Sequence, residues 1–285
     1  SKTPDPFFLA VGFRKPHLPF NAPTKYWDLY QREEIPAPES TGHPTNAPET
    51  ATRSWKELEG YTDIPSDGII GQEKTQELRH GYYACVSYID ALVGRLISTM
   101  SNLNLSEETV ICIWGDHGYH LGEQGLWTKA NNYELSLRVP LIFSIPMQKN
   151  QGSKSHGLVE LVDIYPSICE ACQIEIPTDL EGKSFVPLLN DPNKEWKKAA
   201  YSQFPRNRKG NRHSKHGDIM GYSVRTDTHR YTEWRDWKSN RLINKELYDH
   251  RNDPGEMKNI APIKESQGQL KALNKVLNEG WKSLK

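Results

Sequence analysis

The chain has 285 residues and carries 36 Lys plus Arg against 36 Asp plus Glu, so its formal net charge is zero. This balance excludes a strongly basic chain that mainly binds nucleic acid, although it permits local basic patches. Hydrophobic residues make up 36% and aromatic residues 10% of the chain, which is too rich for disorder. No apolar run reaches ~18 residues, so we expect no membrane-spanning helix.

The first part of the chain predicts one strand, one irregular segment and one long helix. Residues 7–11 form a short apolar run between Pro6 and Gly12, which is typical of a buried strand. Residues 31–71 are rich in Pro, Glu, Thr and Gly and predict an irregular surface segment. Residues 72–103 place apolar side chains at spacings of three and four, which predicts an amphipathic helix.

Two more strands and a second helix follow. The apolar runs at 110–114 and 140–146 predict buried strands, and 158–172 predicts a helix. Strands that alternate with helices indicate an α/β fold, here a partial, mostly parallel sheet flanked by helices. We assign residues 1–195 to this α/β domain.

The sequence pattern then changes to one typical of antiparallel strands. Residues 219–226 and 231–234, joined by a short turn, predict a hairpin, and 246–249 predicts a third strand. Residues 270–284 predict a closing amphipathic helix. Residues 196–285 are therefore expected to form a small C-terminal α+β domain with an antiparallel sheet.

The sequence Gly-Asp-His-Gly at 115–118 directly follows a predicted strand. In open α/β sheets, ligands bind beyond the carboxyl ends of the strands. A carboxylate and an imidazole side by side, Asp116 and His117, can bind a divalent cation, and the flanking glycines allow close approach of backbone or ligand. A plain turn is the alternative, and the position at a strand end is what argues for metal binding or catalysis.

Two further polar residues lie where they could join this pair. Lys129 follows a loop with two glycines that could fold it back towards Asp116, although most lysines are solvated surface charges. His17 follows the first predicted strand, and by itself such a histidine is more often structural than catalytic.

A basic run occupies residues 206–216, with five Lys or Arg and two His and no acid. Its cations are Arg206, Arg208, Lys209, Arg212 and Lys215. A solvated loop is one interpretation, and a surface that attracts an anionic substrate is the other.

The four cysteines are too few for a disulfide scaffold. Cys169 and Cys172 form a Cys-x-x-Cys in an apolar, helix-like stretch without a second Cys pair. This context favours buried thiols or a local disulfide over a zinc or redox site.

Three segments form a specific combination: PFFLAVGFRKPHLPF at 6–20, GDHGYHLGEQGLWTK at 115–129 and IMGYSVRT at 219–226. Together they resemble the type I sulfatases of the alkaline phosphatase superfamily, most closely the iduronate-2-sulfatase type. The resemblance implies a sulfuric ester hydrolase that removes sulfate from sulfated sugars or polysaccharides such as glycosaminoglycans. It also implies that the α/β domain is the C-terminal part of a sulfatase catalytic domain.

The same resemblance implies the site residues. A calcium ion would be held by Asp116 and His117, and the catalytic set would include His17, His117 and Lys129. Cation, ammonium and imidazole together neutralise charge on a transferring sulfate group. The basic run would overhang the pocket, where its cations would bind anionic groups of the sugar.

The sequence departs from the family at the nucleophile. That residue is a formylglycine made from the cysteine of a Cys-x-Pro-x-Arg motif, and no cysteine of this chain is followed by that pattern. The resemblance therefore implies that the nucleophile segment precedes Ser1, in a missing N-terminal segment or in a complementary chain, and we expect the 285-residue chain alone to be inactive. The family implies a secreted, periplasmic or lysosomal location, and no signal peptide begins this chain.

Two other functions stay open at this point. A phosphoesterase of the same superfamily would need more His and Asp ligands for two zinc ions, and the sequence has no further cluster of them. A non-catalytic binder of sulfated glycans would explain the lack of Cys-x-Pro-x-Arg. The sequence upstream of Ser1 would discriminate between enzyme and binder.

Overall fold

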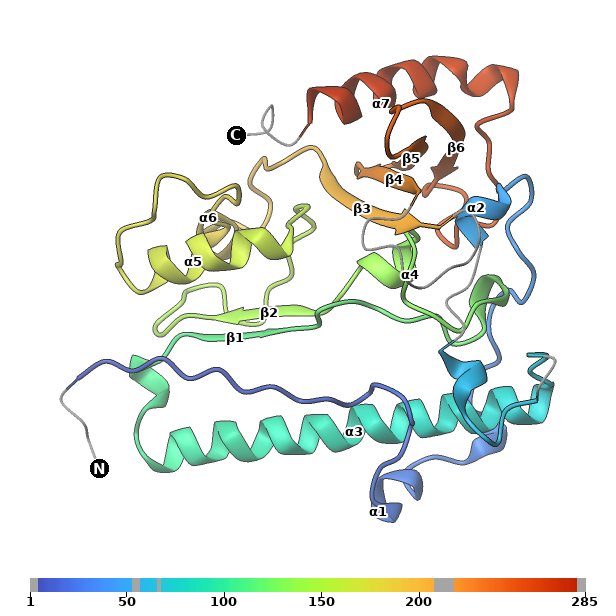
Figure 1. Ribbon diagram of the computed structural model, residues 1–285. Helices are drawn as coiled ribbons and strands as arrows, with labels where there is room; N and C mark the ends of the chain where they lie inside the picture. Colours follow the sequence, from blue (N-terminus) through green and yellow to red (C-terminus); the bar gives the residue numbers. More distant parts are fainter. Residues whose placement is uncertain (1–4, 53–56, 66–67, 208–217, 281–285) are drawn as a thin grey trace. The chain divides into compact units, whose positions relative to one another are not determined.

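The computed structural model describes residues 5–52, 57–65, 68–207 and 218–280 (Figure 1). The chain divides into two units, Ser1–Glu39 with Lys56–Thr109 and Ser40–Trp55 with Val110–Lys285. Both predicted domains, 1–195 and 196–285, contribute to the second unit, and the boundary between them stays a prediction.

The first unit is built on the predicted long helix, α3 (Gln72–Asn102). The helix ends before Asn104, whose φ of 55° takes the chain out of helical geometry. Alongside α3 the unit contains the short helix α1 (Thr24–Trp27) and the 3-10 turns η1 (Arg32–Glu34), η2 (Leu58–Gly60) and η3 (Ser106–Glu108). Among the described residues, no helix combines the length and apolarity needed to cross a membrane.

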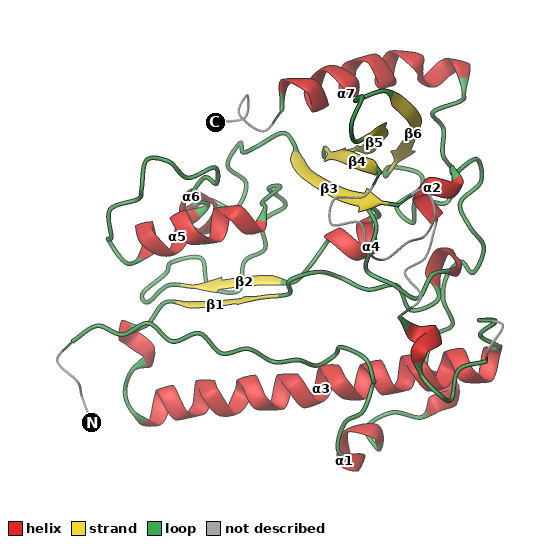
Figure 2. Ribbon diagram, in the orientation of Figure 1, coloured by secondary structure: helices red, strands yellow, loops and turns green. Residues whose placement is uncertain are grey.

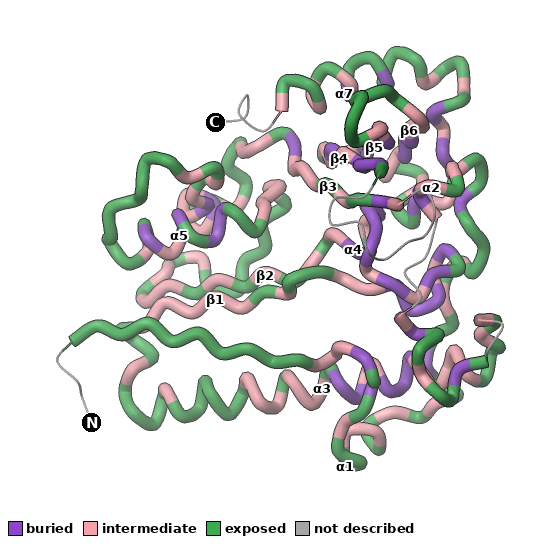
Figure 3. Tube along the Cα trace, viewed as in Figure 1, coloured by how far each residue is buried: buried purple, intermediate pink, exposed green. Residues whose placement is uncertain are grey.

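Gly81 explains how the chain before α1 packs on α3. A Cβ at this position would lie 2.7 Å from the backbone oxygen of Phe20 and 2.9 Å from the Trp27 ring, so only glycine fits. The buried residues of α3 cluster in this half of the helix, from Arg79 to Cys85 (Figure 3).

The strand predicted at residues 7–11 is wrong for this structure. The segment is drawn as a trace without an arrow in Figure 2, and its side chains are exposed, Phe8 by 82%. A strand forms only when a neighbour accepts and donates its backbone hydrogen bonds. Within the described part of the first unit there is no other strand to do so.

The second unit contains a two-stranded sheet of β1 (Ile111–Trp114) and β2 (Leu141–Ser144). The strands pair antiparallel, with Ile111 opposite Ser144 and Trp114 opposite Leu141, and this corrects the mostly parallel sheet expected from sequence. The reason lies in the connection, because parallel strands need a crossover that is usually helical. The intervening chain holds only η4 (Glu123–Gly125) and α4 (Glu134–Leu137).

Short helices pack against the two-stranded sheet of β1 and β2. The turn η5 (Leu161–Asp163) leads into α5 (Ile164–Ala171), and α6 (Val186–Asn190) follows. Ile164, Phe185 and Leu188 form their buried core, against which Leu141 and Phe143 of β2 pack. All four cysteines are free thiols, including Cys169 and Cys172.

The predicted antiparallel sheet is confirmed. It contains β3 (Ala200–Arg206), β4 (Ile219–Arg225), β5 (His229–Asp236) and β6 (Leu242–Asp249), in that spatial order. The predicted hairpin is the β4–β5 pair, in which Val224 lies opposite Tyr231. The α/β class and the C-terminal antiparallel sheet are therefore as predicted, and the correction concerns only the parallel arrangement expected for the first sheet.

Both faces of this sheet carry buried residues (Figure 3). Helix α7 (Gln267–Glu279) packs Leu270 and Leu273 against Val224, Tyr231 and Leu247. The other core contains Leu126 and Tyr133 from the segment after β1, Ala51 from α2 (Glu49–Thr52), and Trp234 and Tyr248 from the sheet. The segment between η4 and α4 is thereby packed against the sheet.

Candidate functional site

Asp116 and His117 lie where the sequence predicts them, directly after β1. Beyond the strand, the Gly115 amide donates to the Pro140 carbonyl at 3.1 Å, and the Gly118 amide donates to the Ser136 carbonyl of α4 at 2.8 Å. These two bonds fix the turn at both ends. The Asp116 side chain is 85% exposed and that of His117 38%, so the pair is open to a ligand.

The hydrogen bonds of His117 assign its proton. Its Nδ1 lies 2.8 Å from the Gly118 carbonyl, which can only accept, so Nδ1 carries the hydrogen. In the neutral ring, Nε2 then carries no hydrogen and has a lone pair that can bind a cation. This nitrogen lies 3.6 Å from Oδ2 of Asp116. Two ligand atoms at ~2.4 Å from one calcium ion can have this separation. The pair therefore fits as part of a cation site, which needs further oxygen ligands to reach about six to eight.

Lys129 lies half-buried in the irregular segment between η4 and α4. Its neighbours Thr128 and Ala130 are buried, with 3% and 8% of their surfaces exposed. Lys129 shares the second unit with Asp116 and His117. That the Lys129 ammonium faces the same pocket as the side chains of Asp116 and His117 stays a prediction.

His17 belongs to the first unit, in a loop with cis peptide bonds before Pro16 and Pro19. Its Nδ1 lies 2.8 Å from the Leu18 carbonyl, and its Nε2 lies 3.3 Å from Oε1 of Glu57. The imidazole therefore has a carboxylate partner that the sequence did not indicate. Its meeting with residues of the second unit also stays a prediction.

Most of the predicted basic run, namely Arg208, Lys209, Arg212 and Lys215, lies outside the described residues. Arg206, the last residue of β3, does not fit the predicted contact with substrate, because it is only 7% exposed. Its guanidinium donates to the backbone carbonyls of Ala130 at 2.5 Å, Thr50 at 3.1 Å and Ala51 at 3.4 Å. It also lies over the Trp234 ring at 5.6 Å from the centroid.

Two of the four thiols, those of Cys85 and Cys112, are not activated as nucleophiles. Burial raises the pKa of Cys112 to about 11, and burial also raises the pKa of Cys85, against a smaller opposing effect of Lys15. Reactive cysteines instead have a lowered pKa and partial exposure.

The second unit contains a buried charge network that the sequence analysis did not predict. Arg230 pairs with Glu256 at 2.6 Å and with Glu134 at 2.5 Å, and Arg225 pairs with Glu134 at 3.1 Å. His250 lies 2.8 Å from Glu256. Ligand atoms of Glu134, His250 and Glu256 lie within 4.8 Å of one another. Two arginines already neutralise these carboxylates, so we assign the group to folding and not to a metal.

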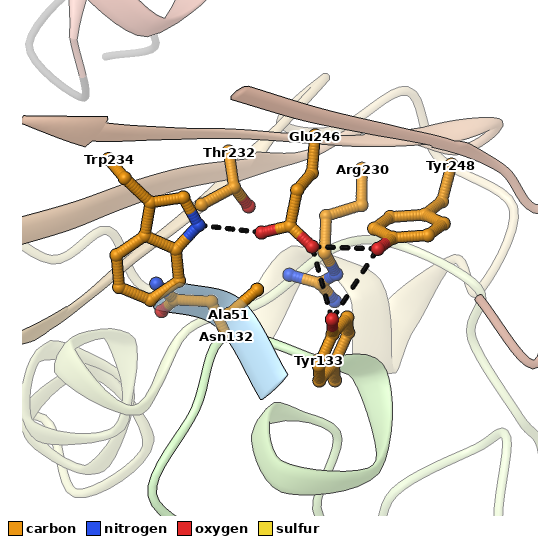
Figure 4. A pocket seen from close by; sticks show the side chains of 8 residues that line it. All are labelled: Ala51, Asn132, Tyr133, Arg230, Thr232, Trp234, Glu246 and Tyr248. Carbon is orange, nitrogen blue, oxygen red and sulfur yellow. Dashed lines mark hydrogen bonds between the residues drawn. The ribbon is translucent and has the colours of Figure 1, made fainter. Parts of the chain in front are cut away.

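A second buried cluster surrounds Glu246 of β6 (Figure 4). Its carboxylate accepts hydrogen bonds from Trp234 Nε1 at 2.7 Å, from Tyr248 at 2.7 Å and from Tyr133 at 3.1 Å. Burial raises the pKa of Glu246 despite these donors. Figure 4 shows the side chains pointing towards one another, so their polar atoms are used within the fold.

The charge network predicts acid sensitivity. Burial is the largest single effect and would raise the pKa values of Glu134 and Glu256. Arg230 opposes it together with Arg225 at Glu134 and with His250 at both, and the sum holds both pKa values below their usual value. The stability from these pairs is therefore full above the unfolded pKa of ~4.3 and is lost as pH falls through the lower folded values. We expect Glu256→Gln to destabilise the chain at neutral pH and to reduce the loss of stability on acidification. Urea unfolding at about pH 7 and at about pH 3, which lies below the unfolded pKa, checks this.

The control for that experiment is Glu279→Gln. The Glu279 side chain is 47% exposed and lies 3.6 Å from Lys275, so its removal should leave the pH dependence as in the original chain. An unchanged acid sensitivity in Glu256→Gln would contradict the prediction.

The fold matches those of other solved proteins. BT4656, solved in complex with its substrate D-glucosamine-2-N,6-O-disulfate, superposes with a TM-score of 0.75 at 22% identity, over 94% of this chain and 64% of that one. The phosphonate monoester hydrolase of Silicibacter pomeroyi superposes with a TM-score of 0.78 at 22% identity, over 95% and 55%. This chain thus shares its fold with a protein that takes a sulfated glucosamine as substrate and with a phosphonate monoester hydrolase.

Sequence comparison makes the family specific. The sulfatase family model matches residues 1–174, and a model described as the C-terminal part of N-sulphoglucosamine sulphohydrolase matches residues 122–283. Iduronate 2-sulfatase of Homo sapiens is 32% identical, over 80% of this chain and 52% of that protein. This chain belongs to the sulfatase family, which confirms the resemblance seen in its motifs. It spans about half the length of the curated relatives that it matches.

Proposed function

We propose that the full-length protein carrying this chain is a sulfuric ester hydrolase of the iduronate-2-sulfatase type, acting on sulfated sugars or polysaccharides. The observation that carries the proposal is the pair at the end of β1, where His117 Nε2 and Asp116 Oδ2 lie 3.6 Å apart and exposed. Membership of the sulfatase family supports the same conclusion.

Each residue has a role in this proposal. Asp116 and His117 would hold a calcium ion, which supplies a positive charge against the sulfate oxygens. The Lys129 ammonium and the His17 ring would contact the sulfate group and stabilise charge that develops on it. The nucleophile in this proposal would be the family's formylglycine, located in a segment other than these 285 residues.

The basic run would serve the rest of the substrate. Arg208, Lys209, Arg212 and Lys215 carry cations without a neighbouring acid, and such a run attracts carboxylated and sulfated sugars. The proposed substrates are therefore glycosaminoglycan-like, and the proposed location is secreted, periplasmic or lysosomal.

The proposal is tested with the full-length protein on para-nitrophenyl sulfate. We expect Asp116→Asn to lower kcat/KM at least about hundredfold and to weaken calcium binding measured by calorimetry, because one charged ligand is lost. Asp227→Asn is the matched control, since Asp227 is exposed in the β4–β5 turn.

Other outcomes of the same assay would overturn the proposal. Preference for a phosphonate or phosphate ester over the sulfate would identify a phosphoesterase, which the shared fold allows. Tight binding of a sulfated oligosaccharide without hydrolysis would identify a glycan binder.

A further inference from the structure

The segment that carries Lys129 is unusual because it is buried without regular secondary structure. Between η4 and α4, Leu126, Thr128 and Ala130 are buried, while the residues between them are half-buried. Lys129 itself is half-buried between two buried neighbours. Buried backbone outside helices and strands must find its hydrogen bonds elsewhere, so the partners of this segment fix its path.

The carbonyls on both sides of Lys129 have partners outside the segment between η4 and α4. The Thr128 carbonyl accepts from the His120 amide at 2.8 Å. The Ala130 carbonyl accepts from Arg206 of β3 at 2.5 Å. The Lys129 carbonyl itself accepts from the Asn131 amide at 3.0 Å. The backbone of Lys129 is therefore held at three successive carbonyls.

Asn131 links this segment to the His120 ring. The Tyr133 amide can only donate, and it donates to Oδ1 of Asn131 at 2.9 Å, which orients the Asn131 side chain. Its Nδ2 then donates to His120 Nε2 at 3.1 Å. Nε2 is thus an acceptor, and Nδ1 carries the proton towards the Glu123 carbonyl at 3.4 Å.

His120 is suited to this role by burial. It is 0% exposed, and burial lowers its pKa, so the ring is neutral. The second histidine of the Gly-Asp-His-Gly-Tyr-His motif therefore acts as a hydrogen-bond acceptor inside the fold.

We infer that His120, Asn131 and Arg206 are positioning residues that fix the backbone of Lys129 and so place its ammonium on the sulfate group. The inference rests on the proposed function. A lysine ammonium sits on a flexible stem, so its placement depends on the anchoring of its Cα, and displacement by about 1 Å can cost about hundredfold in rate.

The test is a double-mutant cycle in the full-length protein, with kcat/KM measured on para-nitrophenyl sulfate. We expect Lys129→Ala to lower kcat/KM at least about hundredfold. His120→Leu should lower it at least about tenfold when Lys129 is present, and by less than about twofold in the Lys129→Ala background. His120→Gln, whose amide oxygen can accept from Asn131, should retain activity within about threefold.

His229→Leu is the matched control. His229 is a buried histidine of β5, 5% exposed, whose Nδ1 lies 2.8 Å from the Thr228 hydroxyl. Any loss of kcat/KM caused by His229→Leu should be the same factor whether position 129 carries Lys or Ala. If His120→Leu does not fold, Arg206→Lys provides the cycle, because a single ammonium cannot replace the guanidinium at three carbonyls.

The outcomes separate this inference from the proposed function. Equal losses from His120→Leu with and without Lys129 would overturn the positioning role and leave His120 as a structural residue. Unchanged hydrolysis in Lys129→Ala alone would instead overturn the assignment of Lys129 in the proposed function.

Discussion

Lys197→Met is expected to lower the free energy of unfolding by about 3–5 kcal/mol, because it leaves a carboxylate buried without its charge partner. The Asp163 side chain is 0% exposed and that of Lys197 6%. The Lys197 ammonium lies 2.7 Å from both oxygens of Asp163 and 3.0 Å from Glu160. The Asp163 carboxylate also accepts from the amides of Glu160 and Lys183 at 2.8 and 2.7 Å.

The neighbouring lysine provides the control. The Lys198 side chain is 82% exposed and lies 3.6 Å from Glu195, which is equally exposed. Lys198→Met should therefore change the free energy of unfolding by less than about 1 kcal/mol. Urea unfolding of both variants measures the difference, and similar values for the two would contradict the buried ion pair as a source of stability.

Elements whose partners lie close in sequence were predicted well. The helix α3, the β4–β5 hairpin and α7 each show their apolar period within their own residues, and the hairpin partners are separated by a short turn. Residues 7–11 show the opposite case. Their apolar run indicates a strand, but strand formation depends on a neighbour that local sequence does not contain.

The same distinction between local and distant partners explains which residues of the candidate site the sequence could indicate. Asp116 and His117 could be proposed from sequence because a strand end and two residues able to bind a cation are adjacent there, and the structure places both directly after β1. The role of Arg206 was not predicted from the sequence, because Arg206 and its contact Ala130 are 76 residues apart along the chain. Its place in a cationic run suggested a solvated position, whereas the end of β3 directs its side chain into the fold. The charge network of Glu134, Arg230 and Glu256 was missed because its members are scattered along the chain.

The glycines around Asp116 and His117 were expected to allow close approach, and the structure separates their roles. A Cβ on Gly118 would lie 2.0 Å from the Leu135 carbonyl oxygen and 3.0 Å from its carbon. A Cβ on Gly115 would have its nearest neighbours, atoms of Pro140 and Val139, at 3.5 Å, which is ordinary contact. Only Gly118 is required by close packing.

Gly118→Ala is therefore expected to lower kcat/KM of the full-length protein on an aryl sulfate at least about hundredfold. The new methyl group would meet backbone of α4, which no change of rotamer can relieve, so the turn must move and carry His117 with it. The overpacking should also cost about 1–3 kcal/mol of stability. Gly115→Ala, two residues from His117 on its other side, should keep activity within about threefold and leave the melting temperature unchanged. Steady-state kinetics and thermal unfolding of both variants test the prediction, and a fully active Gly118→Ala would show that the turn does not depend on its contact with α4.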